Sequence, residues 1–226
     1  MSVHLEEQSG IALALLDRPD RLNALDLATV RAVMAVVDQK KPVLILGSTS
    51  AKAFSSGADT SVSDAERAAV SESLYGLYAA MRASSTIIIT AADGHAIGGG
   101  AQLLLASDIR IAGRSLSIRF VGVGHGLVVG AWGLASLIGR GSALELCLTT
   151  RPIGSDEALA KGLVERVVDD PLTEAIEVGS AIMALDPALI AAAKTIVAIS
   201  DADKALQAER SFNSGWGGSI PGAGPK

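Results

Sequence analysis

The chain has 226 residues, of which 49% are hydrophobic, and its 24 acidic and 19 basic side chains give a net charge of −5. This length and hydrophobicity predict one globular domain with a sizeable core. Nucleic acid is not an expected partner, because nucleic-acid-binding domains carry a basic face and this sequence has no Lys/Arg cluster.

The single cysteine, Cys147, excludes an intramolecular disulfide and fits a reducing compartment; its apolar surroundings in the sequence indicate a buried structural thiol. The N-terminus has no secretory pattern, and no apolar run reaches the roughly 18 residues of a membrane span. A soluble cytoplasmic protein with no membrane partner is therefore expected. With three histidines and one cysteine, no metal site is expected either.

Short β-type runs alternate with helical stretches along the first three quarters of the chain. Strands are predicted at residues 10–17, 42–48, 86–94, 107–113 and 162–168. Helices are predicted within residues 25–37, 63–84, 98–107, 130–150 and 154–162. In the last of these, Ser155 is the expected N-cap and Gly162 follows the helix end. The alternation predicts an α/β fold with mostly parallel, buried strands.

The predicted strands end before Asp170. Two helices are expected between residues 186 and 212, the first opened by Asp186 as N-cap and Pro187 at the first helical position. A Gly/Pro-rich tail follows and is expected to be flexible. The sequence thus predicts an α/β core over residues 1–170, followed by a C-terminal helical region and tail over residues 171–226.

Motif spacing excludes several chemistries. The sequence contains no P-loop, no G-x-S-x-G nucleophile elbow and no G-x-G-x-x-G dinucleotide motif. Four segments do form a recognisable set, in the order LDRPDRLNALD (16–26), KAFSSGADTS (52–61), DGHAIGGGAQLLLASDIRIAG (93–113) and TTRPIGSDEALAKGLVERVV (149–168).

With these segments the chain resembles the crotonase superfamily, the enoyl-CoA hydratase/isomerase family. The resemblance implies a crotonase (ClpP/crotonase-like) fold of stacked ββα units that binds acyl-CoA, a coenzyme A thioester, as substrate or ligand, with no tightly bound cofactor. It also implies a homotrimer or a dimer of trimers, with the C-terminal helices as the trimerisation region.

The resemblance further implies an oxyanion hole built from the backbone N–H groups of Ala58 and Gly99. The physics supports this assignment, because donors fixed at a helix N-terminus stabilise the negative charge of a thioester enolate without reorganising. The three glycines 98–100 would let the thioester lie against the backbone. A tight strand-to-helix turn without a ligand is the alternative explanation of these glycines.

The first segment matches the part of the family that runs beside the nucleotide and pantetheine of CoA. The implied cofactor-binding residues are Arg21, Leu22, Ala24, Ser56, Ala58, Asp59 and Gly99, with Lys52 near the phosphates. Basic side chains there would supply local positive charge that the acidic chain lacks overall.

The carboxylates that family hydratases use are absent at the matching positions. The two hydratase glutamates correspond to Gln102 and Gly122, and an aspartate used by some members corresponds to Gly130. Glutamine can orient a carbonyl or a water but has no proton to exchange near neutral pH. His125 is the remaining titratable candidate, either as an acid–base group or as a structural histidine. The candidate catalytic residues are Ala58, Gly99, Gln102 and His125.

Three functions stay open from the sequence. The first is atypical enolate chemistry on an acyl-CoA, such as decarboxylation, in which loss of CO2 forms the enolate directly. The second is a non-catalytic acyl-CoA-binding protein. The third, weaker alternative is a hydratase or isomerase that uses His125.

Five further residues near these motifs can be explained by a structural role, and three of them also by a role in the site. Tyr75, Tyr78 and Met81 share a helical face, which would line an acyl pocket or face the core. His95 is read as structural, and Asp108 as a helix-end aspartate that pairs with backbone N–H groups.

Overall fold

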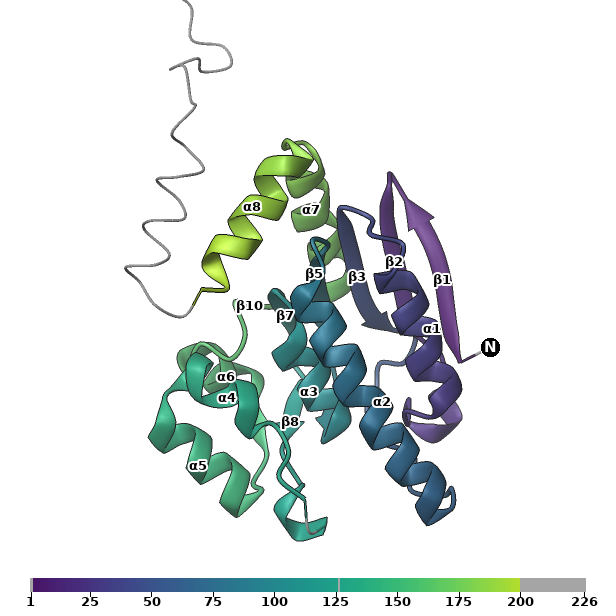
Figure 1. Ribbon diagram of the computed structural model, residues 1–226. Coiled ribbons are helices and arrows are strands. Elements are labelled where there is room, and N and C mark those ends of the chain that lie inside the picture. Colours follow the sequence, from purple (N-terminus) through teal and green to yellow (C-terminus); the bar gives the residue numbers. More distant parts are fainter. Residues whose placement is uncertain (1, 126, 200–226) are drawn as a thin grey trace, which may run out of the picture.

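The structure is a computed structural model that describes residues 2–125 and 127–199 (Figure 1). The second predicted C-terminal helix and the Gly/Pro tail lie outside these residues. Two β-sheets and eight α-helices form the described part of the chain.

The larger sheet has six strands in the order β1-β2-β3-β5-β7-β10. All neighbouring strands run parallel except the β1–β2 pair, which is antiparallel. The strands are β1 (Val3–Gln8), β2 (Ile11–Leu16), β3 (Val43–Ser48), β5 (Ile87–Ala92), β7 (Ile109–Gly113) and β10 (Arg166–Val168). The five predicted strands are thus confirmed. The sixth, β1, was missed because it lies at the sheet edge and only Val3 of its residues is buried.

The smaller sheet has four strands in the order β4-β6-β8-β9. They are β4 (Ala53–Ser55), β6 (His95–Ile97), β8 (Ser117–Arg119) and β9 (Ile153–Gly154). Three times in succession the chain places one strand in the large sheet, the next in the small sheet, and then forms a helix. This repeated ββα unit confirms the predicted α/β class and the crotonase fold.

The helices follow the predicted capping signals closely, with two exceptions. They are α1 (Leu27–Val37), α2 (Asp64–Ala83), α3 (Gly99–Ala106), α4 (Ala131–Ile138), α5 (Arg140–Thr149), α6 (Ser155–Ala160), α7 (Pro171–Met183) and α8 (Pro187–Val197). The predicted stretch 130–150 is two helices, because Gly139 has φ +76° and interrupts the helical backbone. The N-cap of α6 is Gly154 rather than Ser155, whose hydroxyl donates to the Arg114 carbonyl at 3.0 Å. Asp186 caps α8 as predicted, and Asp170 caps α7 in the same way.

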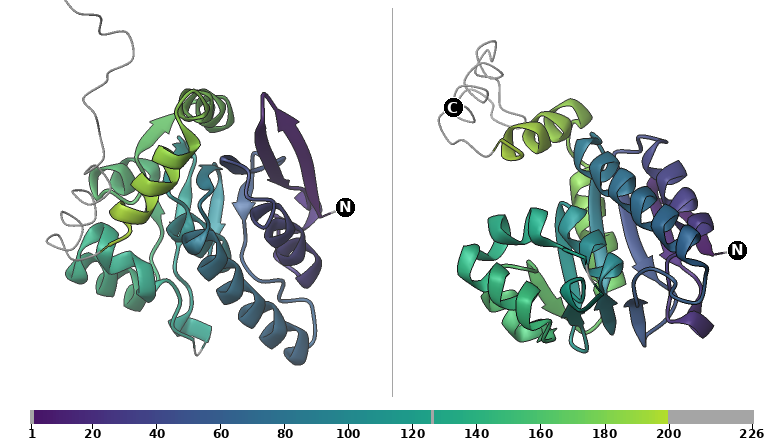
Figure 2. Two further views of the ribbon diagram at one scale, coloured as in Figure 1. Left: turned by 45° about the horizontal axis from the view of Figure 1, so that its top comes forward. Right: turned by 60° about the horizontal axis from the view of Figure 1, so that its bottom comes forward.

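Helices cover both faces of the large sheet (Figure 2). Along β3, Leu44 and Leu46 face the core shared with α1, α2 and α3, while Val43 and Ile45 face the core shared with α7. This two-residue alternation between two buried faces explains why the central strands are continuous apolar runs.

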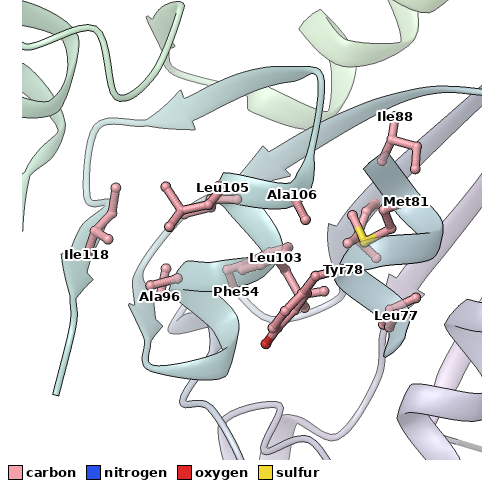
Figure 3. Close-up of a cluster of buried hydrophobic side chains, with 14 of the residues drawn as sticks. Phe54, Leu77, Tyr78, Met81, Ile88, Ala96, Leu103, Leu105, Ala106 and Ile118 are labelled. Carbon is pink, nitrogen blue, oxygen red and sulfur yellow. The ribbon is translucent and has the colours of Figure 1, made fainter. Parts of the chain in front are cut away.

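A cluster of buried side chains between α2, α3 and β4 supports the segments that form the candidate site. Figure 3 shows Tyr78 and Met81 of α2 beside Leu103 of α3, with Phe54 of β4 in the same cluster; all are buried. Close packing at this point fixes α3 against the strand that precedes residues 56–59.

The described residues contain neither a membrane-spanning helix nor a cluster of metal-binding side chains. No single helix among them is long and apolar enough to cross a membrane; α7 and α8 meet that test only when taken together, across a bend of 112°. Nor do three or more His, Cys, Asp or Glu side chains gather in this part of the chain so as to hold a metal ion.

Candidate functional site

The segments 21–25 and 55–59 lie side by side through backbone hydrogen bonds. The amide of Ser56 donates to the Leu22 carbonyl at 2.9 Å. The amide of Leu25 donates to the Gly57 carbonyl at 2.7 Å, and the amide of Asp59 donates to the Leu25 carbonyl at 2.9 Å. The structure therefore brings together the candidates of the first and second motifs.

The first turn of α3 lies directly against the same loop. A Cβ atom added to Gly57 would stand 2.7 Å from the Ile97 carbonyl oxygen and 3.3 Å from the Gly99 amide nitrogen, and Gly57 has φ +91°. A Cβ atom on Gly100 would stand 2.6 Å from the Ser55 carbonyl oxygen. Glycine is thus required on both sides of this contact, because any side chain would separate the two segments.

Among the described residues the amides of Ala58 and Gly99 have no acceptor, and at the start of α3 the amides of Gly100 and Ala101 share this property, as is usual for the first turn of a helix. The amide of Gly57 donates to the Ser55 hydroxyl at 3.2 Å, and that of Gly98 to the Arg119 carbonyl at 2.9 Å. Within residues 2–125 and 127–199, no acceptor lies in hydrogen-bond geometry to the amide of Ala58 or of Gly99. Both residues are partly exposed. Within the described residues both amides are therefore free to donate to a ligand, and the oxyanion hole stays a prediction.

Asp59 connects this loop to a residue that sequence reasoning missed, Arg18. Hydrogen bonds from the hydroxyl and amide of Ser61, supplemented by Arg18, lower the pKa of Asp59 to about 2. Arg18 donates to Asp59 Oδ2 at 3.0 Å and to the Ala24 carbonyl. Since both carboxylate oxygens are occupied, Asp59 holds the loop together and is not set up as a general base. Arg18 could have been found from the sequence, because it lies inside the first motif, residues 16–26.

Gln102 is 4% exposed and its carbonyl oxygen Oε1 accepts two hydrogen bonds. The donors are the Gly130 amide at 3.1 Å and Trp132 Nε1 at 2.9 Å. Trp132 was also missed from the sequence. Its ring stacks on that of Tyr78 with centroids 6.0 Å apart, and the Arg82 guanidinium lies 5.3 Å from its centroid.

Neither glycine expected to replace an acid has room for a side chain. A Cβ atom on Gly122 would stand 2.5 Å from Val129 Cγ2 and 2.8 Å from the Leu127 carbonyl oxygen. On Gly130, which has φ +82°, a Cβ atom would collide with the Phe120 ring. A carboxylate at either position would require the surrounding chain to move.

The three residues of the predicted α2 face have different surroundings. Met81 and Tyr78 are buried in the core, whereas Tyr75 is exposed. The Tyr78 hydroxyl donates to the Gly99 carbonyl at 3.0 Å, and burial raises the pKa of Tyr78, so that it stays a protonated donor. Tyr78 therefore contacts the candidate site directly, and Met81 supports it from the core.

The remaining candidates differ in their exposure to solvent. Arg21, Leu22 and Lys52 are exposed and Ala24 is buried. The backbone of His125 lies in a 3-10 helix, Val123–His125, and its side chain is outside what the structure describes. The roles of all these residues toward a ligand stay predictions.

The residues that were read as structural are placed as follows. Asp108 accepts from the Ile88 amide at 2.8 Å, as expected, and also from Lys194 at 2.8 Å. Cys147 is buried, which raises its thiol pKa, and His95 is exposed on β6.

Two surface pockets lie away from this centre. One is lined by residues of the β3–β4 connection, by Asp93 and by the start of α7. The other lies between the β1–β2 hairpin and the end of α1. Neither contains a residue predicted for the site.

Comparison with known proteins identifies the class to which this fold and site belong. The family described as Enoyl-CoA hydratase/isomerase matches residues 6–220. The chain is therefore a member of the enoyl-CoA hydratase/isomerase family.

Individual relatives support the same assignment. The chain is 30% identical to a short-chain-enoyl-CoA hydratase of Clostridium acetobutylicum over 211 residues, covering 87% of this chain and 80% of that protein. It is 32% identical to a crotonyl-CoA hydratase of Syntrophomonas wolfei over 182 residues, covering 74% and 69%. The crystal structure of an enoyl-CoA hydratase from Bacillus anthracis superimposes with a TM-score of 0.89 at 27% identity, covering 96% of this chain and 91% of that chain.

Proposed function

We propose that the protein binds an acyl-CoA thioester with its carbonyl oxygen on the amides of Ala58 and Gly99, and that it carries out enolate chemistry other than hydration. The observation that carries the proposal is the contact between Gly57 and the first turn of α3, beside which both amides lack an acceptor among residues 2–125 and 127–199. Family membership supplies the ligand class.

Decarboxylation of a malonyl-type thioester is the reaction that fits these residues best. The bond between the α-carbon and the carboxylate breaks, CO2 leaves, and the electron pair forms an enolate whose oxygen the two amides stabilise. A proton from water then adds to the α-carbon. No protein base is needed in the bond-breaking step.

Hydration is disfavoured because water must be deprotonated as it adds. The Gln102 side chain does not titrate near neutral pH, and its carbonyl oxygen is already occupied by Gly130 and Trp132. Positions 122 and 130 have no space for a carboxylate, and Asp59 is held by Ser61 and Arg18. A hydratase or isomerase would therefore depend on His125.

The second candidate function is non-catalytic acyl-CoA binding. The observation that favours it is the structural use of Gln102, which ties α3 to α4 rather than presenting its carbonyl oxygen to a ligand. Both candidates require the same two amides.

Gly99→Pro tests the proposal. Gly99 is the first residue of α3, a helix position where proline is tolerated, so this change removes one N–H. A Cβ atom at this position would stand 3.1 Å from Leu74 Cδ1, so that side chain must shift by a few tenths of an ångström. The matched control is Arg140→Pro, which places proline at the first residue of α5, also after a glycine N-cap. Circular dichroism checks that both variants are folded.

The assays are acetyl-CoA formation from malonyl-CoA, hydration of crotonyl-CoA, and calorimetric binding of butyryl-CoA. We expect malonyl-CoA turnover to fall roughly 100-fold or more in Gly99→Pro and to stay unchanged in Arg140→Pro. Micromolar binding without turnover of either thioester supports the binding function instead. Hydration that disappears in His125→Ala contradicts both, and absence of any thioester binding contradicts the whole proposal.

We further propose that the chain assembles as a homotrimer or a dimer of trimers through residues 171–226 and is cytoplasmic. Sedimentation velocity of the full chain tests the assembly. Cell fractionation tests the location.

A further inference from the structure

The peptide group between Gly57 and Ala58 has its direction fixed by Leu25. The Gly57 carbonyl accepts a hydrogen bond from the Leu25 amide at 2.7 Å, and Leu25 and Ala58 form a parallel bridge. The described peptide bonds are all trans, so the carbonyl and the N–H of one peptide group point in opposite directions. The Ala58 N–H therefore points away from Leu25, and no acceptor meets it among residues 2–125 and 127–199.

A second peptide group lies behind the first. The Leu25 amide shares its peptide group with the Ala24 carbonyl, which accepts a hydrogen bond from Nη1 of Arg18. The guanidinium thus donates to one peptide group, whose N–H donates at 2.7 Å to the next, whose N–H is that of Ala58. Two peptide groups in series therefore connect the positive charge of Arg18 with the Ala58 donor of the predicted oxyanion hole.

This series of hydrogen bonds is enclosed by the protein. Leu25 is 1% exposed, Ala24 is 8% exposed and Gly57 is buried. Away from water, hydrogen bonds in series polarise and strengthen one another, by about 10–30% per bond, and a charged donor makes a stronger bond than a neutral one. A guanidinium at the start of the series therefore makes the N–H at its end a stronger donor to an anionic oxygen.

Two carboxylates hold Arg18 in this place. Its Nη2 lies 3.0 Å from Asp59 Oδ2, and its Nη1 lies 3.2 Å from Asp26 Oδ2. Asp26 is itself fixed as the N-cap of α1, and Asp59 by its hydrogen bonds from Ser61. Arg18 in turn offsets the negative charge of Asp59, which is buried and follows Ala58 directly. Without Arg18 that charge would oppose any negative charge that develops at the Ala58 amide.

The other predicted donor, Gly99, is supported in a different way. The carbonyl of its peptide group belongs to Gly98 and accepts from the Gln102 amide at 3.0 Å, at the start of α3. The Gly99 N–H is therefore supported by the dipole of that helix. Ala58 lies outside every described helix, between β4 and α2. The series that begins at Arg18 supplies at Ala58 the polarisation that α3 supplies at Gly99.

We infer that Arg18 is a positioning residue for the thioester carbonyl, and that it acts on the Ala58 N–H through the two intervening peptide groups. This role rests on the proposed function and adds to it a residue outside the oxyanion hole. Arg18 orients the Ala58 amide, strengthens it as a donor and offsets the charge of Asp59 beside it. Because an enolate oxygen gains more from such a donor than a neutral carbonyl does, Arg18 affects turnover more than binding.

The test is infrared spectroscopy of bound butyryl-CoA that carries carbon-13 at the thioester carbonyl. Hydrogen bonds to a carbonyl lower its stretching frequency, so the lowering on binding reports how strongly the two amides polarise it. Arg18→Gln should reduce this lowering and reduce kcat for malonyl-CoA roughly threefold to tenfold, while butyryl-CoA affinity changes less than about twofold. Arg18→Lys, which keeps the positive charge, should retain more of the lowering than Arg18→Gln.

Two further variants are the controls. Arg114→Gln removes an exposed arginine that pairs with Asp169, and it should leave the carbonyl frequency, affinity and kcat unchanged. Asp59→Asn removes the carboxylate but leaves the bond from Arg18 to the Ala24 carbonyl in place. It should therefore reduce the lowering less than Arg18→Gln does. Circular dichroism checks that each variant is folded.

If butyryl-CoA does not bind to the unaltered chain, the proposed function fails and the role of Arg18 falls with it. If it binds with the same lowered frequency in the unaltered chain and in Arg18→Gln, the proposed function stands and the role of Arg18 is overturned. Equal reductions in Arg18→Gln and Asp59→Asn also overturn it, because Arg18 would then act only by holding Asp59. If Arg18→Gln does not fold, Asp59→Asn decides: retention of most of the lowering supports the role of Arg18, and its complete loss overturns it.

Discussion

The ammonium group of Lys194 lies 2.8 Å from Oδ2 of Asp108 and joins α8 to the start of β7. The Lys194 side chain is buried and also donates to the carbonyls of Met81 and Thr86 at 3.1 and 2.7 Å. The last described helix, which otherwise buries only Ile190, is thus held by one charged side chain.

Lys194→Met should lower the free energy of unfolding by about 2–3 kcal/mol, because it leaves Asp108 without its counter-charge and two carbonyls without a donor. Urea denaturation measures this change, and hydrogen exchange should show faster exchange in α8. The control is Lys41→Met, whose exposed pair with Glu7 at 2.8 Å should contribute less than about 1 kcal/mol. Equal losses in both variants would contradict the role of Lys194.

The lowered pKa of Asp59 predicts that the protein loses stability in acid. The Asp59 pKa in the folded chain is about 2 against an ordinary 3.8, chiefly because of the Ser61 hydrogen bonds. A lowered carboxyl pKa contributes stability that is complete above about pH 5 and is lost as the pH falls through 3.8 to about 2. We expect this contribution to be roughly 1–2 kcal/mol.

The measurement is the free energy of unfolding between pH 5 and pH 2. The unaltered chain should lose more stability over this interval than Asp59→Asn, which does not titrate. Ser61→Ala should move the loss to higher pH, since it removes the side-chain hydrogen bond that lowers the pKa most. Parallel pH curves for all three chains would refute the assignment.

The sequence predicted the large sheet better than the small one, and the reason is strand length. Strands such as β3 and β5 have six residues, five of them buried, between two layers of helices, so the sequence shows them as apolar runs. The strands of the small sheet have two or three residues each, too few for periodicity to detect.

Some residues of the candidate site could also be predicted from the sequence, and others could not. Gly57 and Gly99 could be predicted because a backbone contact leaves a glycine motif in the sequence. Trp132 could not be predicted as the partner of Gln102, because the pair is separated by 30 residues and depends on how α4 returns to α3. Arg18 was passed over in favour of Arg21, since the motif does not indicate which arginine faces the loop.

Gly122→Glu should not convert the chain into a hydratase. A side chain at 122 would meet Val129 and the Leu127 carbonyl at 2.5 and 2.8 Å, so we expect a loss of about 1–3 kcal/mol of stability. The double variant with Gln102→Glu places glutamate at both positions where the family resemblance implies one, and it should still hydrate crotonyl-CoA no faster than the unaltered chain. A gain of tenfold or more would show that the loop around Gly122 rearranges readily.

A last prediction separates the two tyrosines of α2. Tyr78 is buried and its hydroxyl donates to the Gly99 carbonyl at 3.0 Å, whereas the Tyr75 hydroxyl lies on the surface, 3.3 Å from the Val128 carbonyl. Tyr78→Phe should cost about 1 kcal/mol of stability, because it removes one buried hydrogen bond and little volume. Tyr75→Phe, the matched control, should change stability by less than about 0.5 kcal/mol.

The same pair tests whether Tyr78 positions Gly99. If it does, Tyr78→Phe should lower malonyl-CoA turnover several-fold while butyryl-CoA binding changes little, because a misplaced amide weakens enolate stabilisation more than ground-state binding. Tyr75→Phe should change neither quantity. A loss of binding and turnover in equal proportion would instead assign Tyr78 a general packing role, in which the Gly99 contact has no separate effect on the chemistry.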